Sequence, residues 1–531
     1  MVVSNAALEK NLIQRVCVGD IPARSANHFP DKVAIIDEGQ RFTYRKFNDL
    51  VNCLGNVLLQ LGARHQDVVA VMCPNTWEML VSYFACAKAG LVAMPVNLGL
   101  KAHEVAYCFH DSQAKILIAD GAFAEMMSRV IPELPHLQHV IWTRVEGELP
   151  AVGKTSHRME TLLSSGQSRE VETLIDDRDI VQLLYTSGTT SNPKGVLTSH
   201  VAVTIAALSS ALQNKTDHTH VTLSVLPLFH CAMLNAGAIP LLLVGGTLVL
   251  VKKFDPLRVA ELIEREQVTH VGLLPMMYQA MLDHPATRSR VFSSVKMARY
   301  AMTPLPEKTL HELKKMFPNA DLLLGSGQTE FTPPTTYQRP EHQFVKSASW
   351  GVATPMVQIE IMDEEGNLLP RGQIGEIVYR GPHVMEGYLN LPEQTAESFR
   401  YGWFHSGDLA WMDEEGVVWF ADRKKDMIKT GGENVASIEV ERLLMGHPAV
   451  QEAAVIGLPH PYWGEAVTAV VMRKPGEEVT EEALIAYAKE HLAGFKVPKR
   501  VIFTDELPKT GTGKIQKHLL RQRFQNLYHD T

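Results

Sequence analysis

The stretch LLYTSGTTSNPKGVLTSH at 183–200 is the first candidate for a functional site. It contains a run of hydroxyl residues and one lysine. The loop residues ahead of Lys194 include Ser187, Gly188, Thr189 and Thr190. Hydroxyl groups, backbone N–H groups and a lysine charge together suit a loop that covers a polyphosphate. A Ser/Thr-rich surface turn is the alternative, but the apolar strand expected directly before the loop makes it the less favoured one.

The order of residues around the lysine distinguishes this stretch from a P-loop, which reads G-x-x-x-x-G-K-[ST]. Gly188 and Lys194 have the P-loop spacing, but Pro193 precedes the lysine and Gly195 follows it. Proline lacks the backbone N–H that would point at a phosphate, and glycine has no hydroxyl to hold a metal. The stretch is therefore a different kind of phosphate loop. A P-loop NTPase remains an alternative from another functional class.

The composition excludes several classes of protein. The 531 residues carry a formal net charge of −8, whereas nucleic-acid-binding proteins are usually basic. Six cysteines without a close pair fit a reducing compartment. The most apolar stretch, 238–251, is shorter than the ~20 residues of a membrane span, and the N-terminus lacks the apolar run of a signal peptide. We expect a cytoplasmic protein without a nucleic-acid partner or a transmembrane segment.

Short β-rich runs alternate with helical runs between residues 68 and 325. The first series has expected strands at 68–73, 91–96 and 115–120, with expected helices at 76–90 and 101–111. This alternation predicts an α/β fold with parallel-rich sheets. The polar stretch near 146–170 is expected to be a loop.

The pattern changes after about residue 340, where short strands follow one another with Gly, Pro and Asp turns. The expected strands are 358–363, 375–381 and 416–422. They predict a small β-barrel or antiparallel module at about 340–422, which would complete a large N-terminal domain at 1–422. Residues 427–531 are expected to form a mobile α+β domain, with a hinge at 423–426.

The sequence resembles the adenylate-forming superfamily, which includes acyl-CoA synthetases, peptide-synthetase adenylation domains and luciferases. Six motifs that occur in order along nearly the whole chain carry the resemblance. They are YTSGTTSNPKGV (185–196), GSGQTE (325–330), GEIVYRG (375–381), YGWFHSGD (401–408), DRKKDMIKTGGENV (422–435) and PKTGTGKIQK (508–517). The resemblance implies ATP and Mg²⁺ as cofactors and a C-terminal domain that rotates between two reaction steps.

The resemblance also implies where the nucleotide would be held. The expected ATP- or AMP-binding residues are Thr186, Ser187, Gly188, Thr189, Thr190, Lys194, Gly325, Ser326, Gly327, Gln328, Thr329, Asp408, Arg423 and Lys514. Asp408 would accept hydrogen bonds from both ribose hydroxyls, since one carboxylate can accept two. Arg423 would also reach the ribose. Glu330 would ligate Mg²⁺ with help from the Thr186 hydroxyl, because a hard cation takes oxygen ligands.

The remaining roles concern catalysis and the second substrate. By resemblance the catalytic residues are Lys514, Lys194 and Glu330, with Lys514 reaching the carboxylate and the α-phosphate. Lys425 would be the hinge of the rotation. Gly432 would line the tunnel of coenzyme A, since a side chain there would block the pantetheine arm. His230 would be a gate at the acyl pocket.

The chemistry that these parts imply needs no general base, because a carboxylic acid is already ionised at pH 7. Catalysis then consists of placement and of neutralising charge on the phosphates. The first step would yield acyl-AMP and pyrophosphate, and a thiol would displace AMP in the second. Coenzyme A is the expected thiol; a carrier protein is the alternative acceptor. A non-catalytic binding module is the least favoured alternative, since the lysine, glutamate and aspartate of the site are all present.

The acid is the least determined part of this prediction. The pocket is expected to draw on 230–237, 272–277, 301–304 and 325–331, which are largely apolar and contain no Lys or Arg for a second carboxylate. This favours a hydrophobic monocarboxylic acid, either a medium- or long-chain fatty acid or an aryl acid. Met302 and Thr303 are expected to line the pocket, in a stretch before Pro304 where the superfamily often has small residues, and Met302 is expected to shorten or reshape it. A homodimer is a possible assembly.

Overall fold

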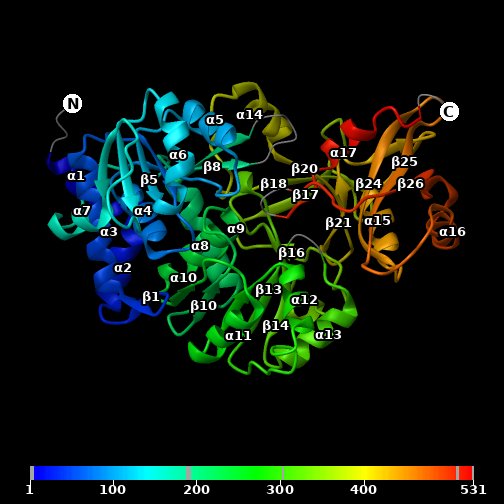
Figure 1. Cartoon of the computed structure of the whole chain (residues 1–531), viewed down its shortest axis with the longest axis horizontal. Coiled ribbons are helices and arrows are strands. Elements are labelled where there is room, and N and C mark those ends of the chain that lie inside the picture. The colour runs from blue at the N-terminus through cyan, green and yellow to red at the C-terminus, as the bar shows by residue number, and fades with distance from the viewer. Residues whose placement is uncertain (1–4, 187–192, 302–303, 510–512, 529–531) are drawn as a thin grey trace. The chain divides into compact units, whose positions relative to one another are not determined.

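The computed structural model describes residues 5–186, 193–301, 304–509 and 513–528, and it divides the chain into two compact units (Figure 1). The first unit comprises Met1–Gln358 and Arg380–Phe399. The second unit comprises Ile359–Tyr379 and Arg400–Thr531. These boundaries differ from the expected division at 423–426, and the position of the hinge stays a prediction.

One sheet of the first unit contains β8 and β9, the two strands that flank the predicted phosphate loop in the sequence. Its strand order is β19-β9-β8-β4-β3-β5-β6-β7. The strands are β3 (Val68–Met72), β4 (Val92–Pro95), β5 (Ile116–Asp120), β6 (His139–Thr143), β7 (Thr155–Arg158), β8 (Ile180–Thr186), β9 (Lys194–Ser199) and β19 (Gly387–Tyr388). The strands from β8 to β7 run parallel, and β9 and β19 are added antiparallel at one edge. The predicted parallel-rich α/β sheet is confirmed.

A second sheet of this unit has nine strands in the order β16-β15-β14-β13-β12-β10-β11-β1-β2. They are β1 (Val33–Asp37), β2 (Gln40–Thr43), β10 (Val221–Ser224), β11 (Thr247–Leu250), β12 (His270–Gly272), β13 (Met297–Tyr300), β14 (Asp321–Ser326), β15 (Thr336–Tyr337) and β16 (Val352–Ala353). The strands from β1 to β14 are parallel. Strands β2, β15 and β16 join antiparallel at the two edges.

Helices connect the parallel strands of both sheets (Figure 1). Those of the first unit are α1 (Asn5–Gln14), α2 (Ile21–His28), α3 (Tyr44–Gln60), α4 (Trp77–Lys88), α5 (Ala102–Ser112), α6 (Ala124–Val130), α7 (Met159–Ser165), α8 (His200–Gln213), α9 (Cys231–Met233), the π-helical segment η4 (Leu234–Ala238), α10 (Ile239–Leu243), α11 (Pro256–Arg265), α12 (Pro275–Asp283), α13 (Glu307–Met316) and α14 (Pro392–Ser398). Local sequence explains several starts: Asp255 accepts the N–H of Arg258 at 2.8 Å, and Pro256 opens α11.

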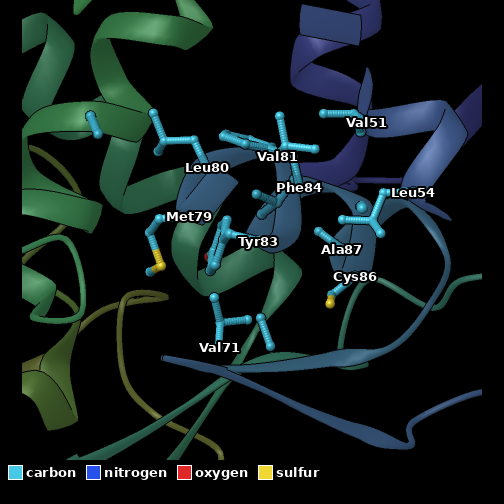
Figure 2. Close-up of a cluster of buried hydrophobic side chains, with 14 of the residues drawn as sticks. Val51, Leu54, Val71, Met79, Leu80, Val81, Tyr83, Phe84, Cys86 and Ala87 are labelled. Atoms are coloured by element: carbon cyan, nitrogen blue, oxygen red, sulfur yellow. The ribbon is translucent and has the colours of Figure 1, made fainter. Parts of the chain in front are cut away.

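The core of the first unit is built around α4, which is mostly apolar and buried along its length. A helix of this kind must be enclosed by other elements. Figure 2 shows Tyr83 and Phe84 of this helix among side chains of α3 and β3, including Leu54 and Val71. Phe84 meets Phe47 of α3 edge to face, with ring centroids 5.7 Å apart. This packing holds α4 against the face of the sheet that contains β3 and β4, the two strands that it connects.

The second unit contains two further sheets. One has the order β17-β18-β20-β21, from β17 (Gln358–Met362), β18 (Gly375–Arg380), β20 (Phe404–Met412) and β21 (Val418–Arg423). The other has the order β23-β22-β25-β24, from β22 (Ile428–Thr430), β23 (Glu433–Val435), β24 (Val450–His460) and β25 (Gly464–Arg473), with β26 (Arg500–Phe503) beside β25. Helices α15 (Ser437–Met445), α16 (Glu481–His491) and α17 (Lys517–Phe524) complete this unit, so the expected antiparallel module and α+β character are confirmed.

The expectation of a loop near 146–170 is wrong, because β7 and α7 lie there. Strand β7 is the edge strand of its sheet, and its residues Thr155–Arg158 are only partly buried. A polar composition is normal for an edge strand, which faces solvent on one side. Strand β9 was also not among the strands expected from the sequence. Among the described residues, no helix combines the length and the apolar character needed to cross a bilayer.

Candidate active site

The predicted phosphate loop joins β8 to β9, so a β-hairpin holds its two ends. Thr186 and Lys194 are opposite each other in the register of this hairpin. The Thr186 hydroxyl lies 3.5 Å from the carbonyl oxygen of Lys194, to which it donates. Ser187, Gly188, Thr189 and Thr190 lie outside the described residues. The ladder therefore sets the backbone position of Lys194 at the base of the loop.

Lys194 and Glu330, two of the predicted catalytic residues, both contact Tyr388, which was not predicted from the sequence. The Lys194 Nζ lies 5.0 Å from the ring centroid of Tyr388, a distance at which the ring face attracts a cation. The Tyr388 hydroxyl donates to Glu330 Oε1 at 3.1 Å. Burial and the Glu330 charge raise the pKa of Tyr388, so its hydroxyl stays a donor at neutral pH. Lys194, Tyr388 and Glu330 thus form one cluster.

The two-residue strand β19 places Tyr388 in this cluster by pairing with β9. Tyr388 is opposite Val196, two residues beyond Lys194. The backbone of the same segment also holds the glutamate, since Met385 N–H donates to the Glu330 carbonyl at 2.8 Å. A Gly-Tyr pair shortly after the GEIVYRG motif is the only trace of this arrangement in the sequence.

Tyr388→Phe tests this cluster. We expect the change to keep the ring beneath Lys194 and to release the Glu330 carboxylate. A hydrogen bond to a charged group contributes about 1.5–3 kcal/mol, so acid-dependent pyrophosphate release should fall about tenfold or more. The measurement is that rate over a range of ATP and Mg²⁺ concentrations, with Tyr107→Phe in α5 as the matched control. An unchanged rate and Mg²⁺ dependence would contradict the cluster's role.

The predicted nucleotide-binding motif GSGQTE begins with the last two residues of β14, and close packing requires both of its glycines. A Cβ on Gly325 would lie 2.4 Å from the ring of Tyr337 in the paired strand β15, and one on Gly327 would lie 2.7 Å from Pro333. Thr335 N–H donates to the Ser326 carbonyl at 2.9 Å. Residues 325–327 therefore pack closely against residues 333–337. Gln328, which follows them, is half-buried, and Thr329 is buried.

His230 is the N-cap residue of α9, and its neighbour in the sequence contacts the GSGQTE motif. Its Nδ1 accepts the N–H of Ala232 at 3.2 Å, and its neighbour Cys231 places Sγ 3.3 Å from the hydroxyl of Thr329. The π-helical segment η4 follows, and such segments are frequent at functional sites. The gate function of His230 stays a prediction. Met302 and Thr303, the other predicted pocket residues, lie outside the described residues.

The predicted ribose-binding pair lies in the second unit, on the neighbouring strands β20 and β21. Asp408 and Arg423 are opposite each other in the register, with Asp408 Oδ1 and Arg423 Nε 3.3 Å apart. Asp408 is 8% exposed, and Arg423 is more open. The structure therefore brings these two predicted residues together as an ion pair at one end of the ladder.

A buried carboxylate, not identified from the sequence, supports this pair. Glu376 accepts the N–H of Gly407 at 2.9 Å, and its second oxygen lies 3.1 Å from His405 Nδ1 and 3.2 Å from Lys424 Nζ. Gly407 and Lys424 directly adjoin Asp408 and Arg423. Burial alone would raise the pKa of Glu376, but the hydrogen bonds from His405 and Gly407 and the Lys424 charge lower it to about 2.

Glu376→Gln should therefore weaken the turn before Asp408. A carboxylate with a depressed pKa stabilises the fold above its unfolded pKa of about 4.5, and this contribution is lost as the pH falls towards about 2. We expect the variant to unfold about 1–3 kcal/mol more easily at pH 7. The measured difference from the wild type in denaturant unfolding should shrink below pH 4.5. A difference that stays constant over this range would contradict the ionised Glu376.

Lys514, Lys425 and Gly432 also belong to the second unit. Lys514 is exposed, next to the bridge between Lys509 and Ile515. The pKa of Lys425 is lowered, first by desolvation and then by Arg423 and other cations that include Lys514. Gly432 lies in the tight turn between β22 and β23 with φ +86°. The roles of all three as swinging lysine, hinge and tunnel residue stay predictions.

Comparison with known proteins decides the family. A model of the AMP-binding enzyme family matches residues 22–389, and the model of its C-terminal domain matches residues 439–514. The chain belongs to the AMP-binding enzyme family. The predicted resemblance to adenylate-forming enzymes and the predicted acyl-CoA synthetase class are thereby confirmed, because the related proteins are acyl-CoA synthetases and CoA ligases.

The similarity extends over nearly the whole length of the relatives. The feruloyl-CoA synthase of Amycolatopsis sp is 36% identical over 509 residues, which cover 96% of this chain and 99% of that protein. The indoleacetate–CoA ligase of Aromatoleum aromaticum is 33% identical over 500 residues, 94% and 96% of the two chains. The crystal structure of ATP-bound MatB from Rhodopseudomonas palustris superposes with a TM-score of 0.86 at 30% identity, covering 96% of this AMP-binding enzyme and 99% of MatB.

Proposed function

We propose that this acyl-CoA ligase activates a hydrophobic monocarboxylic acid, either a fatty acid or an aryl acid, with ATP and transfers the acyl group to coenzyme A. The observation that carries the proposal is the cluster of Lys194, Tyr388 and Glu330 at the base of the phosphate loop. Relatives named for feruloyl, indoleacetate and long-chain fatty acids support an acid of this class. ATP is supported by the ATP-bound MatB structure.

In the first step, the carboxylate oxygen of the acid attacks the α-phosphorus of ATP, and the bond to pyrophosphate breaks. The acid is ionised at pH 7, so no residue has to remove a proton. The chain supplies charge and placement: Lys194 would neutralise the leaving phosphates, and Lys514 would contact the reacting carboxylate and the α-phosphate. Such fixed charges act where negative charge develops in the transition state.

The residues present fit a magnesium ion. Glu330 uses Oε1 to accept from Tyr388, and its Oε2 has no hydrogen bond to a described residue. The Thr186 hydroxyl is a second oxygen at the loop base. Mg²⁺ is usually held by one or two carboxylates together with substrate phosphates and water, and Glu330 would be such a carboxylate. When bound, Mg²⁺ neutralises phosphate charge.

In the second step, the thiol of coenzyme A gives up its proton to solvent and its sulfur forms a bond to the acyl carbon. The bond between that carbon and the phosphate oxygen breaks, and AMP leaves with the electron pair. The ribose of AMP would be held by Asp408 and Arg423. Rotation at Lys425 would carry Lys514 away and bring the turn at Gly432 to the thiol's path. A cytoplasmic location and a homodimeric assembly stay predictions from the sequence.

A carboxylic-acid panel tests this function. The enzyme is incubated with ATP, Mg²⁺ and each acid, with and without coenzyme A, while pyrophosphate, orthophosphate and acyl-CoA are followed. We expect acid-dependent pyrophosphate release, and thioester only with coenzyme A. Acyl-AMP turnover that ignores coenzyme A would indicate a carrier-protein acceptor. Orthophosphate release without any acid would contradict the proposal in favour of an NTPase.

A further inference from the structure

Arg299 of β13 is a cation that was not among the residues predicted for the acyl pocket. It is opposite Gly272 of β12 in one direction and Leu323 of β14 in the other. Its Nη1 donates to the carbonyl oxygen of Ala236 and to the hydroxyl of Tyr337, both at 3.0 Å. The guanidinium is therefore fixed on the inner face of the nine-stranded sheet, beside η4.

The surroundings of Arg299 join the four segments from which the acyl pocket was predicted. Ala236 belongs to 230–237, Gly272 begins 272–277, Arg299 precedes 301–304 by two residues, and Tyr337 packs on Gly325 of 325–331. The expectation that these segments contain no Lys or Arg is correct for the segments themselves. Arg299 lies just outside them in the sequence and between them in the fold.

The strand next to β13 leaves open space on the face that Arg299 occupies. Residues paired across parallel strands point to the same side of a sheet, so Gly272 faces the side on which Arg299 lies. A Cβ built on Gly272 would have no heavy atom of the described residues within 4 Å, although this glycine is half-buried in the middle of the sheet. A larger side chain at this position would fill the space, so glycine leaves room for a ligand.

Arg299 and Tyr337 have unused hydrogen-bond donors. Nε of Arg299 is buried without a hydrogen-bond partner among the described residues. Nη2 makes no hydrogen bond to them, and no described carboxylate forms an ion pair with Arg299. The Tyr337 hydroxyl, 4% exposed as a residue, accepts from Arg299, and its own proton has no acceptor in the described part of the chain. A buried donor without an acceptor is costly and calls for a partner.

We propose that Arg299 and Tyr337 are specificity-determining residues that bind an oxygen acceptor at the far end of the acyl group. The inference rests on the proposed acid-activating function and narrows its substrate class to acids with a distal oxygen. The Nε–Nη2 edge of arginine presents two parallel N–H groups, the geometry that takes a carboxylate, carbonyl or phenolic oxygen. The Tyr337 hydroxyl adds a third donor. An acid with an unsubstituted hydrocarbon end would leave all three donors without an acceptor.

Matched acids that differ only in the distal oxygen provide the test. The pairs are cinnamate with 4-hydroxycinnamate, and hexanoate with 6-hydroxyhexanoate, with adipate as the charged member. Hydrogen bonds to a charged donor give about 10- to 150-fold discrimination, so we expect kcat/KM to favour an oxygen-bearing acid by that factor through a lower KM. Preference for adipate alone would support Arg299 while contradicting the monocarboxylic part of the proposed function.

Variants connect any preference to these two side chains. Arg299→Met should reduce the ratio of kcat/KM values within a pair to near one, and Tyr337→Phe should reduce it severalfold. Arg299→Lys keeps the charge but loses the two-donor edge, so we expect it to lower the ratio as well. It replaces Arg299→Met as the test if the methionine variant does not fold. Arg258→Met on α11, whose arginine pairs with Glu261, is the control that should keep the wild-type ratio.

The results separate this inference from the proposed function. If no acid supports pyrophosphate release, the proposed function itself fails. If acids are activated but the wild type does not prefer the oxygen-bearing member of either pair or adipate, the Arg299 proposal is overturned alone. The same holds if Arg299→Met and Arg299→Lys keep the preference of the wild type.

Discussion

Replacement of Lys514 by alanine should lower acyl-AMP formation about 100- to 1,000-fold while leaving thioester formation from supplied acyl-AMP nearly unchanged. Loss of one fixed donor at a developing charge has effects of this size. Lys514 would act only in the first step, since the proposed rotation removes it before the thiol attacks. The measurement compares pyrophosphate release from acid and ATP with acyl-CoA formation from synthetic acyl-AMP.

The surroundings of Lys514 supply the control for this experiment. Lys509 lies in the same C-terminal segment, but its ammonium pairs with Glu452 at 2.7 Å. Lys509→Ala removes a nearby positive charge without touching the proposed chemistry, so both half-reactions should remain close to the wild-type rates. Equal losses of both steps in Lys514→Ala would contradict a function confined to adenylation. Lys514→Arg keeps the charge and should recover part of the first step if charge is the main contribution.

The main features of the fold could be predicted because they depend on local patterns. Apolar strands such as β3 and β5 are buried on both sides and stand out from the helices that separate them. The prediction of a loop at 146–170 was wrong because pairing with its neighbour β6, and not its own composition, makes β7 a strand. Edge strands that are short and polar carry no periodic signal of their own.

The site was predictable where a motif is continuous in the sequence and not where it is assembled by tertiary contacts. Lys194 and Glu330 follow from motifs, but Tyr388 joins them only because β19 pairs with β9 across nearly two hundred residues. Glu376 and Arg299 were missed for a related reason. A single charge within a strand is usually a solvated side chain, and only the packed sheets reveal that these two face inward.

The second large effect is expected at Gly432, in the turn between β22 and β23. Its φ of +86° lies in the left-handed region, where residues with a Cβ cost about 1–2 kcal/mol. No heavy atom of the described residues lies within 4 Å of a Cβ built there, so a side chain would point into open space. Any substitution therefore strains the turn, and only a large one fills the proposed tunnel.

Two variants separate strain from obstruction, because Gly432→Ala and Gly432→Leu share the same backbone penalty and differ in bulk. We expect Gly432→Leu to reduce acyl-CoA formation from supplied acyl-AMP about 100-fold, since a misplacement of 1 Å has effects of this size. Gly432→Ala should lose less than about tenfold, as steric obstruction is then small. Acyl-AMP formation should be retained in both variants, because the turn would serve only the thiol. If the two variants lose thioester formation equally, strain in the turn explains the loss, and the tunnel assignment fails.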